Sequence, residues 1–322
     1  MKKILHIGIN TEYFKPDAIQ KGFEENGYEY SFLDWQKLRF NAGIEGARER
    51  MIGKAMIERP DIIFMQLQNP DILDEDTAIS ISNFGFVINF SEDVREDIEW
   101  YKKAGDKIGL TIFTNLDDVA RMKAAGIENV SYMMPSFNDL WYKKTKPSKR
   151  EGEIVFIGNN YVGSNLNFPK AQERADMVNF MRKEFGDRFV VYGNNWDGYA
   201  KFATPQDEVD IYNSCKIAIT HNNFFRAGYT SDRMFRSMAC GALTISQFFP
   251  YINKEFNMTQ IGAWADFEML RTECNRYLED EALRKQKALT GYNFVHSRHT
   301  WKQRAKEIIK LSIKHGAEEL AD

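Results

Sequence analysis

Short apolar runs alternate with helix-length amphipathic stretches along the first half of the chain. The pattern predicts strands at residues 3–9, 28–33, 61–68, 84–90, 107–113 and 130–134. It predicts helices near residues 15–26, 45–58, 74–82, 94–104 and 116–125. Strands that alternate with helices indicate βαβ units and therefore a parallel sheet. Ile62–Met65 is apolar at every position, which predicts a central strand buried on both faces.

The alternation stops over residues 138–152 and then starts again. This stretch is polar and carries five basic residues around Pro147. We interpret it as an interdomain linker that separates residues 1–137 from residues 153–295, with a last helical segment at 296–322.

The second half repeats the same alternation. Strands are expected at 153–157, 188–192, 216–220 and 242–246, and helices at 170–185, 206–213, 230–241 and from 266 onward, with a turn near Gly291. Three of these strands run into small or polar residues, beginning at Gly158, Gly193 and His221. Carboxyl ends of parallel strands share one edge of the sheet, where ligands bind, so the pattern predicts a ligand site there. Ordinary turn chemistry is the competing interpretation of the Gly-Asn pairs.

Length and composition narrow the class of protein. The 322 residues fit two α/β domains of about 150 residues each. The three cysteines are odd in number and lack metal or redox spacing, which favours reduced thiols in a cytoplasmic protein. No apolar run approaches the roughly 18 residues of a membrane span, so no membrane association is expected.

Charge is unevenly distributed between the two halves. Residues 1–137 hold 16 Lys and Arg against 23 Asp and Glu, whereas the remainder holds 27 against 23. The second half is therefore the better host for an anionic ligand, and the acidic first half disfavours a broad nucleic-acid surface.

An arginine cluster marks the start of the helix expected from Thr230. Arg226, Arg233 and Arg236 lie around a helix N-terminus, although the helix dipole favours cations at the opposite end. An anion held between the arginines and the helix N–H groups would remove this conflict, and a diphosphate fits that description. A solvated helix face remains the alternative.

Residues 231–246 resemble the donor-binding helix and following strand of GT-B glycosyltransferases, in particular the spore-maturation-protein-like group and similar phage-encoded enzymes. Members show the pattern Ser-x-Arg-x-Phe-Glu-x-x-Ala-Cys-Gly. The chain matches it at Ser231, Arg233, Phe235, Ala239, Cys240 and Gly241. It departs at Arg236, where the family commonly has a glutamate that holds the donor ribose.

Two further segments carry the resemblance. Tyr277–Asp280 and His296–Arg304 look like the closing pattern of the group, whose last helix usually braces the first domain. His296 and His299 lack an evident third ligand, so no metal site is expected, as is usual for GT-B enzymes. In the first half, the residues around Asn89 and Asp93 resemble strand ends of the phage-type members, with Glu92 in place of a glycine.

The resemblance implies an α/β protein of GT-B type, with two Rossmann-like domains facing a central cleft. It implies a metal-independent transferase that uses a nucleotide-diphosphate sugar, with a UDP-sugar favoured, and needs no catalytic cofactor. Asp93 and Arg233 are the expected catalytic residues, with Asp93 as base and Arg233 on the leaving group. The expected donor-binding residues are Gly158, Asn159, Gly193, Asn194, His221, Asn222, Arg226, Tyr229, Thr230, Ser231 and Arg236. The expected acceptor-side residues are Gly8, Asn10, Glu12, Gln66, Gln68 and Arg95.

Several alternatives stay open from sequence. Asp93 also suits a cap for the helix expected at 94–104, and Glu12 is a second possible base. Relatives in phages make hydroxymethylpyrimidine in DNA an acceptor to consider beside a protein, glycan or small molecule. A non-catalytic nucleotide- or sugar-binding module is the runner-up. A nicotinamide-dependent oxidoreductase is disfavoured because Gly8 and Gly158 are not followed by the remaining glycines of G-x-G-x-x-G.

Overall fold

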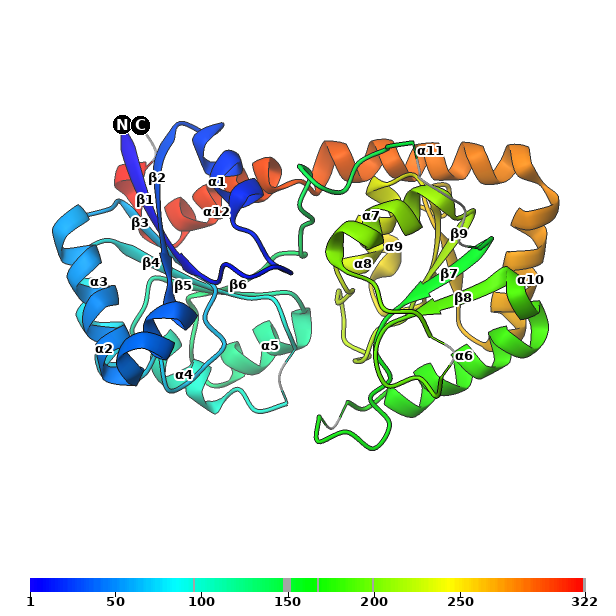
Figure 1. The fold of residues 1–322 in the computed structure, drawn as a ribbon. Helices are drawn as coiled ribbons and strands as arrows, with labels where there is room; N and C mark the ends of the chain where they lie inside the picture. The colour runs from blue at the N-terminus through cyan, green and yellow to red at the C-terminus, as the bar shows by residue number, and fades with distance from the viewer. Residues whose placement is uncertain (95, 147–151, 167, 199, 321–322) are drawn as a thin grey trace. The chain divides into compact units, whose positions relative to one another are not determined.

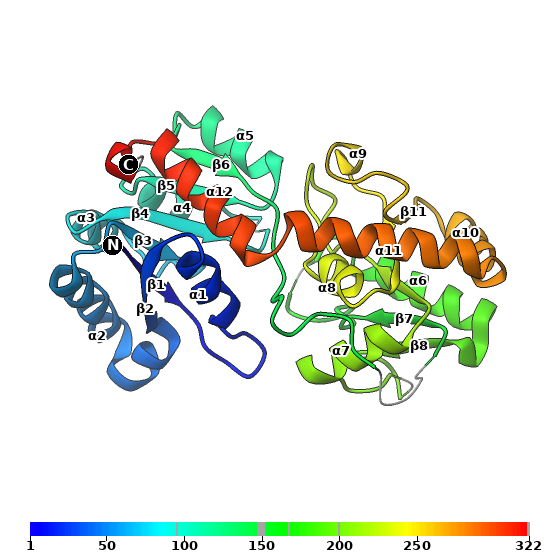
Figure 2. The same cartoon turned by 90° about the horizontal axis from the view of Figure 1, so that it is seen from above.

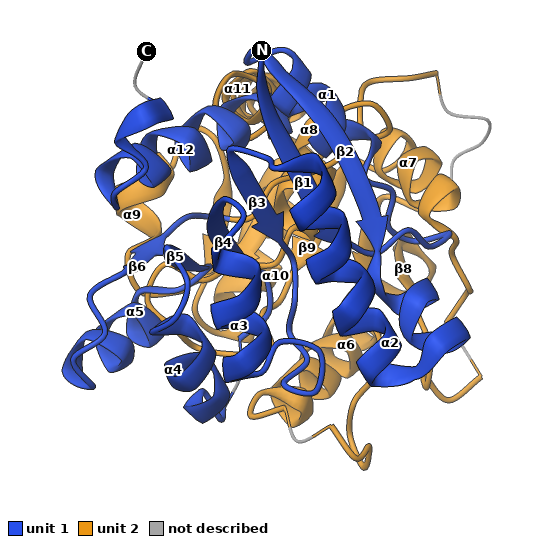
Figure 3. Cartoon of the chain, turned by 90° about the vertical axis from the view of Figure 1, so that its left-hand side faces the viewer, with its two compact units in different colours: residues 1–134, 301–322 blue, residues 135–300 orange. Residues whose placement is uncertain are grey.

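The computed structural model describes residues 1–94, 96–146, 152–166, 168–198 and 200–320. The predictions that concern Arg95 and residues 147–151 therefore lie outside the described residues. The chain forms two compact units (Figure 3). Unit 1 comprises Met1–Met134 and Trp301–Asp322, and unit 2 comprises Pro135–Thr300. Each unit holds a parallel sheet with helices around it, which confirms the predicted α/β class with two Rossmann-like domains.

Unit 1 is built on a six-stranded sheet in the order β2-β1-β3-β4-β5-β6 (Figure 1). Its strands are β1 (Lys2–Gly8), β2 (Tyr28–Asp34), β3 (Ile62–Met65), β4 (Phe86–Ser91), β5 (Leu110–Phe113) and β6 (Val130–Tyr132). Its α-helices are α1 (Asp17–Glu24), α2 (Trp35–Glu58), α3 (Glu75–Ser82), α4 (Glu99–Gly105), α5 (Leu116–Ala124) and α12 (Trp301–Lys314), followed by a 3₁₀ turn, η2 (Glu318–Leu320).

Alternating residues of these strands bury two different faces. Leu5, Ile63 and Val87 pack against α2, α3 and α4. The opposite face carries His6 and Phe64, whose rings meet each other. The Phe64 ring also meets the ring of Phe23 on α1. Burial of both faces explains why the central strands are apolar almost throughout.

The last helix, α12, completes the second face of unit 1. The Trp301 ring meets Phe64 and Phe90 edge-on, with ring centroids 6.4 Å apart in both pairs. Helix α1 lies so close that a Cβ on Gly22 would come within 2.6 Å of the Trp301 carbonyl oxygen. Helices α1 and α12 lie side by side in both Figure 1 and Figure 2. A segment that follows unit 2 in sequence thus belongs to the core of unit 1.

Unit 2 is built on a five-stranded sheet in the order β11-β10-β9-β7-β8. Its strands are β7 (Ile154–Ile157), β8 (Phe189–Tyr192), β9 (Ile217–Thr220), β10 (Leu243–Gln247) and β11 (Gly262–Trp264). Its helices are α6 (Ala171–Phe185), η1 (Gly186–Arg188), α7 (Pro205–Ser214), α8 (Arg233–Ala239), α9 (Ile252–Glu255), α10 (Phe267–Glu279) and α11 (Glu281–Arg298). Strand residues such as Phe156 and Ile219 pack with Met177 of α6 and Tyr277 of α10.

The structure differs from the sequence prediction at the expected linker, at Gly291 and at Asp93, among other places. The expected linker begins within unit 2: Tyr142 is buried there, and its hydroxyl donates to Glu208 at 2.8 Å. Gly291 lies inside α11 rather than at a turn. A glycine is needed there because a Cβ would come within 2.5 Å of the Gln260 carbonyl oxygen. Helix α4 begins at Glu99, so Asp93 does not cap it. Within the described residues, no helix has the length and apolar character that a membrane crossing requires.

Candidate functional site

The three predicted strand ends of unit 2 meet at one edge of its sheet, since β9, β7 and β8 are parallel neighbours. Gly193 follows β8 with φ +138°, and a Cβ on it would lie 2.3 Å from the carbonyl oxygen of Gly158, which follows β7. The Asn194 N–H donates to Asn159 Oδ1 at 2.9 Å. The loops after β7 and β8 are therefore fixed to each other, and only a glycine allows this approach.

Asn222, after β9, organises the loop that leads to α8. Its Nδ2 donates to the Tyr229 carbonyl at 3.3 Å, and its Oδ1 accepts from the Ser231 N–H at 3.0 Å. The side chain predicted to touch a ligand is thus used to fold residues 223–230, including half-buried Arg226, into a compact loop.

Helix α8 begins later than predicted. Its first residue is Arg233 and its N-cap is Asp232. Thr230 is buried and its hydroxyl donates to Met234 Sδ, so the helix expected from Thr230 begins three residues later. Ser231 Oγ accepts weakly from the Arg233 N–H, at 3.4 Å.

Arg174 is a residue of this edge that the sequence analysis missed. It lies on α6, is 5% exposed, and donates to the carbonyl oxygens of Asn159 (3.2 Å) and His221 (2.9 Å). Burial, together with the positive charge of Arg233, lowers its pKa to about 10. The sequence does contain a sign of its burial. Arg174 precedes the buried Val178 and Met181 by four and seven residues, a spacing that places all three on the same face of the helix.

The two arginines share an unmet hydrogen-bonding requirement. The Nε of Arg174 and the Nε of Arg233 are both buried without a partner among the described residues. Two neighbouring guanidinium groups with buried, unsatisfied N–H donors have the chemistry to hold an anion.

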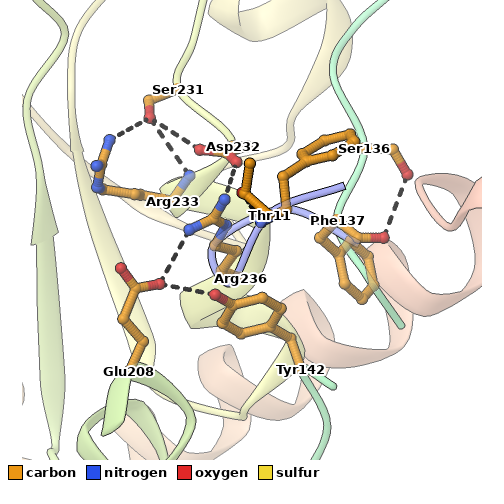
Figure 4. Close-up of polar contacts among 10 residues, drawn as sticks. Thr11, Ser136, Phe137, Tyr142, Glu208, Ser231, Asp232, Arg233 and Arg236 are labelled. Atoms are coloured by element: carbon orange, nitrogen blue, oxygen red, sulfur yellow. Dashed lines mark hydrogen bonds and ion pairs between the residues drawn. The ribbon is translucent and has the colours of Figure 1, made fainter. Parts of the chain in front are cut away.

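Arg236 is engaged within unit 2 instead (Figure 4). Its guanidinium donates to Glu208 at 3.0 Å and to Asp232 at 2.5 Å, and lies 5.1 Å above the Tyr142 ring. Although burial opposes it, the Asp232 and Glu208 carboxylates keep the pKa of Arg236 well above its usual value. Arg236, which the sequence predicts to bind the donor, is thus held in an internal network.

His221 is also held internally, by α6. It is 4% exposed, and its Nε2 lies 3.6 Å from a Glu173 carboxylate oxygen. Burial lowers the His221 pKa to about 4, so the ring is neutral at pH 7. The contact with His221 lowers the pKa of Glu173 to about 2, although burial opposes it. The Lys170 ammonium, 2.8 Å from the Glu173 carboxylate, acts in the same direction.

The edge of the unit 1 sheet has different chemistry. Gln66, directly after β3, is buried and its Oε1 lies 2.8 Å from His6 Nε2. A Cβ on Gly8 would lie 2.5 Å from that same nitrogen, so the glycine makes room for the pair. Burial lowers the pKa of His6 to about 3, which keeps this ring neutral as well.

A cavity of about 310 Å³ opens at this edge, lined by residues that follow β1, β3 and β4. It brings together the predicted Gln66, Gln68 and Asp93 with Trp35 and Glu92. Asp93 is exposed, and its carbonyl oxygen accepts from the Ser91 hydroxyl at 3.2 Å. A carboxylate on the wall of a polar cavity is suitably placed to receive a proton from a bound hydroxyl.

The other predicted residues lie elsewhere. Asn10 and Glu12 are exposed, and Asn10 accepts from the Lys15 ammonium at 3.1 Å. His299 is buried and stacks on Phe256 with a centroid distance of 5.9 Å. No group of three or more His, Cys, Asp or Glu side chains suited to a metal occurs in the described part of the chain.

The two parallel α/β units are the kind of architecture that GT-B proteins have. Residues 172–310 match a family model described as glycosyl transferase-like, which confirms the predicted resemblance over that segment. No curated protein matched the sequence.

Solved structures support the same class over nearly the whole chain. HepE from Anabaena, in complex with UDP, has a TM-score of 0.64 at 12% identity, covering 96% of this chain and 100% of that one. A glycosyltransferase from Rickettsia africae ESF-5 has a TM-score of 0.66 at 9% identity, covering 98% of each chain. The DNA-modifying enzyme β-glucosyltransferase has a TM-score of 0.59 at 13% identity, covering 97% and 99%. At these identities the likeness shows a shared GT-B fold.

Proposed function

We propose that this protein transfers a sugar from a UDP-sugar to an acceptor hydroxyl. The observation that carries the proposal is the buried pair Arg174 and Arg233, whose Nε donors have no partner among the described residues. A diphosphate supplies the acceptor oxygens that both guanidinium groups require. The glycosyl transferase-like match over 172–310 includes both arginines, and HepE binds UDP and UDP-glucose.

Charge on the departing diphosphate is stabilised by these arginines, so the chemistry proceeds without a metal. Arg233 has its charge maintained by the Asp232 and Glu208 carboxylates, which raise its pKa although burial opposes them. The loops that begin at Gly158 and Gly193, fixed to each other, provide the backbone on which the base and ribose rest. The three free cysteines support a reducing, cytoplasmic compartment.

The acceptor hydroxyl is bound at the unit 1 cavity, with Asp93 as its proton acceptor. If the reaction inverts the anomeric carbon, the Asp93 carboxylate takes the proton as the hydroxyl attacks. If it retains the configuration, the leaving phosphate takes the proton and Asp93 orients the acceptor.

A second candidate acceptor is hydroxymethylpyrimidine in DNA. The fold shared with DNA-modifying β-glucosyltransferase favours it, and the net acidic first 137 residues oppose it. Retention of hydroxymethylated duplex that falls steeply with salt would support this acceptor.

The donor assignment is tested by thermal unfolding with UDP, GDP, ADP, CMP and their sugars, with NAD as control. UDP at about 100 times its dissociation constant stabilises a one-site protein by about 2.7 kcal/mol. Arg233→Ala should abolish the shift and Arg271→Ala, in an exposed ion pair, should keep it. A shift with NAD alone overturns the proposal, and UDP-sugar binding without transfer or hydrolysis favours a non-catalytic binding module.

A further inference from the structure

The cavity of unit 1 contains a second unmet hydrogen-bonding requirement, separate from that of the arginines. Trp35 and Gln66 both line it and are 7% and 8% exposed. The indole Nε1 and the amide Nε2 of these residues are buried and lack a partner among the described residues. Both groups donate, so each calls for an acceptor oxygen or nitrogen on a ligand.

The Gln66 amide is held in its donating orientation by a chain of side chains behind it. The Tyr30 hydroxyl lies 2.6 Å from His6 Nδ1, and His6 Nε2 lies 2.8 Å from Gln66 Oε1. Because Gln66 Oε1 can only accept, His6 Nε2 carries the hydrogen and Nδ1 accepts from Tyr30. With its oxygen accepting from His6, the part of Gln66 that remains without a partner among the described residues is its N–H₂ group.

The rest of the lining suits hydroxyl groups rather than phosphates. Gln68 and Asn69 contribute amides, Glu92 and Asp93 contribute carboxylates, and no Lys or Arg is among the described lining residues. Carboxylates accept hydrogen bonds from hydroxyls but repel anions, and residues 1–137 carry a net charge of −7. Phe14 and Trp35 supply aromatic surface against which a weakly polar C–H face can pack.

These observations favour one class of ligand. A pyranose ring has hydroxyls that donate to carboxylates, oxygens that accept from amides, and an apolar C–H face for an aromatic ring. The cavity volume of about 310 Å³ lies at the lower end of the roughly 300–1,000 Å³ typical of small-molecule sites. It therefore suits one monosaccharide unit.

We propose that the unit 1 cavity is a subsite for an uncharged sugar, so that the acceptor is a neutral saccharide rather than DNA or a phosphorylated compound. The part of this inference that makes the bound sugar an acceptor rests on the proposed function. Sugar binding to unit 1 is nevertheless measurable without any donor.

Saturation-transfer NMR and calorimetry on the full chain test the inference. The ligands are methyl glycosides of glucose, galactose, mannose and N-acetylglucosamine, glucose 6-phosphate, and a duplex that contains hydroxymethylcytosine. At least one neutral glycoside should bind about 10-fold more tightly than glucose 6-phosphate, with little change between about 50 and 500 mM salt.

Two variants assign that binding to the cavity. Trp35→Phe removes one donor but keeps an aromatic ring, and should weaken glycoside binding about 3- to 10-fold. Gln66→Glu preserves an oxygen for His6 and removes the N–H₂ group, with a loss of similar size. The matched control is Trp100→Phe, because Trp100 packs on Tyr101 and is not among the residues that line the cavity.

Binding of no neutral glycoside overturns the inference, as do equal losses in Trp35→Phe and Trp100→Phe. Preferential, salt-sensitive binding of the duplex overturns it in favour of DNA. UDP binding is followed in the same samples and should be unchanged by Trp35→Phe. Loss of UDP binding in every sample would instead refute the proposed function.

Discussion

The sheet edges of units 1 and 2 share a parallel backbone arrangement and differ in the charge of their buried donors. The buried donors that we assign to ligands are the guanidinium groups of Arg174 and Arg233 in unit 2 and the neutral N–H groups of Trp35 and Gln66 in unit 1. Both edges place polar groups where strands end, as parallel sheets do. The fold therefore supplies the location of each candidate site, while a few buried side chains give the two sites their different charge.

Supporting side chains reinforce the contrast. His6 and His221 are each buried at one of these edges, and burial keeps both neutral at pH 7. In unit 1 the neutral histidine orients an amide, whereas in unit 2 it lies beside the Glu173 carboxylate.

Removal of the Asp93 carboxylate should abolish the proton transfer proposed for the edge of the unit 1 sheet. Asp93→Asn removes the proton acceptor but preserves shape, so turnover should fall about 10²- to 10⁴-fold if the enzyme inverts. Steady-state transfer rates at saturating UDP-sugar measure the effect. Glu12→Gln is the paired variant: near-normal turnover for Asp93→Asn with a large loss for Glu12→Gln would move the base to Glu12.

Removal of the Arg233 guanidinium should weaken binding of the sugar donor at the edge of the unit 2 sheet. Arg233→Ala leaves Arg174 alone beside the diphosphate, and turnover should fall about 10²- to 10³-fold. Calorimetry with UDP and transfer rates are the measurements. An Arg233→Ala protein that binds UDP like the native chain would show that the anion site is elsewhere.

Substitution of Arg236 should lower the stability of unit 2, because Arg236 belongs to an internal network. Arg236→Leu leaves Glu208 buried without its cation, which should lower the free energy of unfolding by about 3 kcal/mol in urea titrations. Arg271→Ala breaks a pair whose arginine side chain is 41% exposed and should cost less than about 1 kcal/mol. Equal losses in the two variants would contradict the assignment of Arg236 to an internal network.

Acid should weaken both units through their histidines. The folded pKa values of His6 and His221, about 3 and about 4, lie below the usual 6.5, so the unfolded chain binds more protons in that interval. Stability therefore falls as pH drops below about 6.5, by up to about 1.4 kcal/mol per pH unit for each histidine.

Urea titrations between about pH 4.5 and 7 measure that slope. Glu173, with its pKa held at about 2, keeps its contribution over this range and does not confuse the result. His6→Phe should flatten the slope by one proton, and a slope unchanged from the native chain would refute the neutral, buried state of His6.

Much of the fold was predictable from residue pattern, because buried parallel strands such as Ile62–Met65 are apolar throughout and short. Boundaries were harder where tertiary contact decides them. Gly291 looks like a helix breaker in sequence, but the backbone of Gln260 lies so close that only glycine fits inside the helix. Strand β11 is three residues long and had no periodic signal.

The candidate sites were predictable to the level of the sheet edge. Strand-end residues Gly158, Gly193 and His221 do meet in unit 2, and Gln66, Gln68 and Asp93 line one cavity in unit 1. Sequence could not separate ligand contacts from supports: Asn222 folds its own loop, and Arg236 has two carboxylate partners from α7 and its own helix. Such roles depend on which neighbours tertiary folding supplies.

The contribution of α12 to unit 1 has a consequence for how the chain matures on the ribosome. Every residue of unit 2 is translated before Trp301 emerges to cover Phe64 and Phe90, so unit 2 can finish folding while unit 1 is still open on one face. A released chain truncated after Thr300 should show a protease-resistant unit 2 and a sensitive unit 1, and equal resistance of both would refute this order.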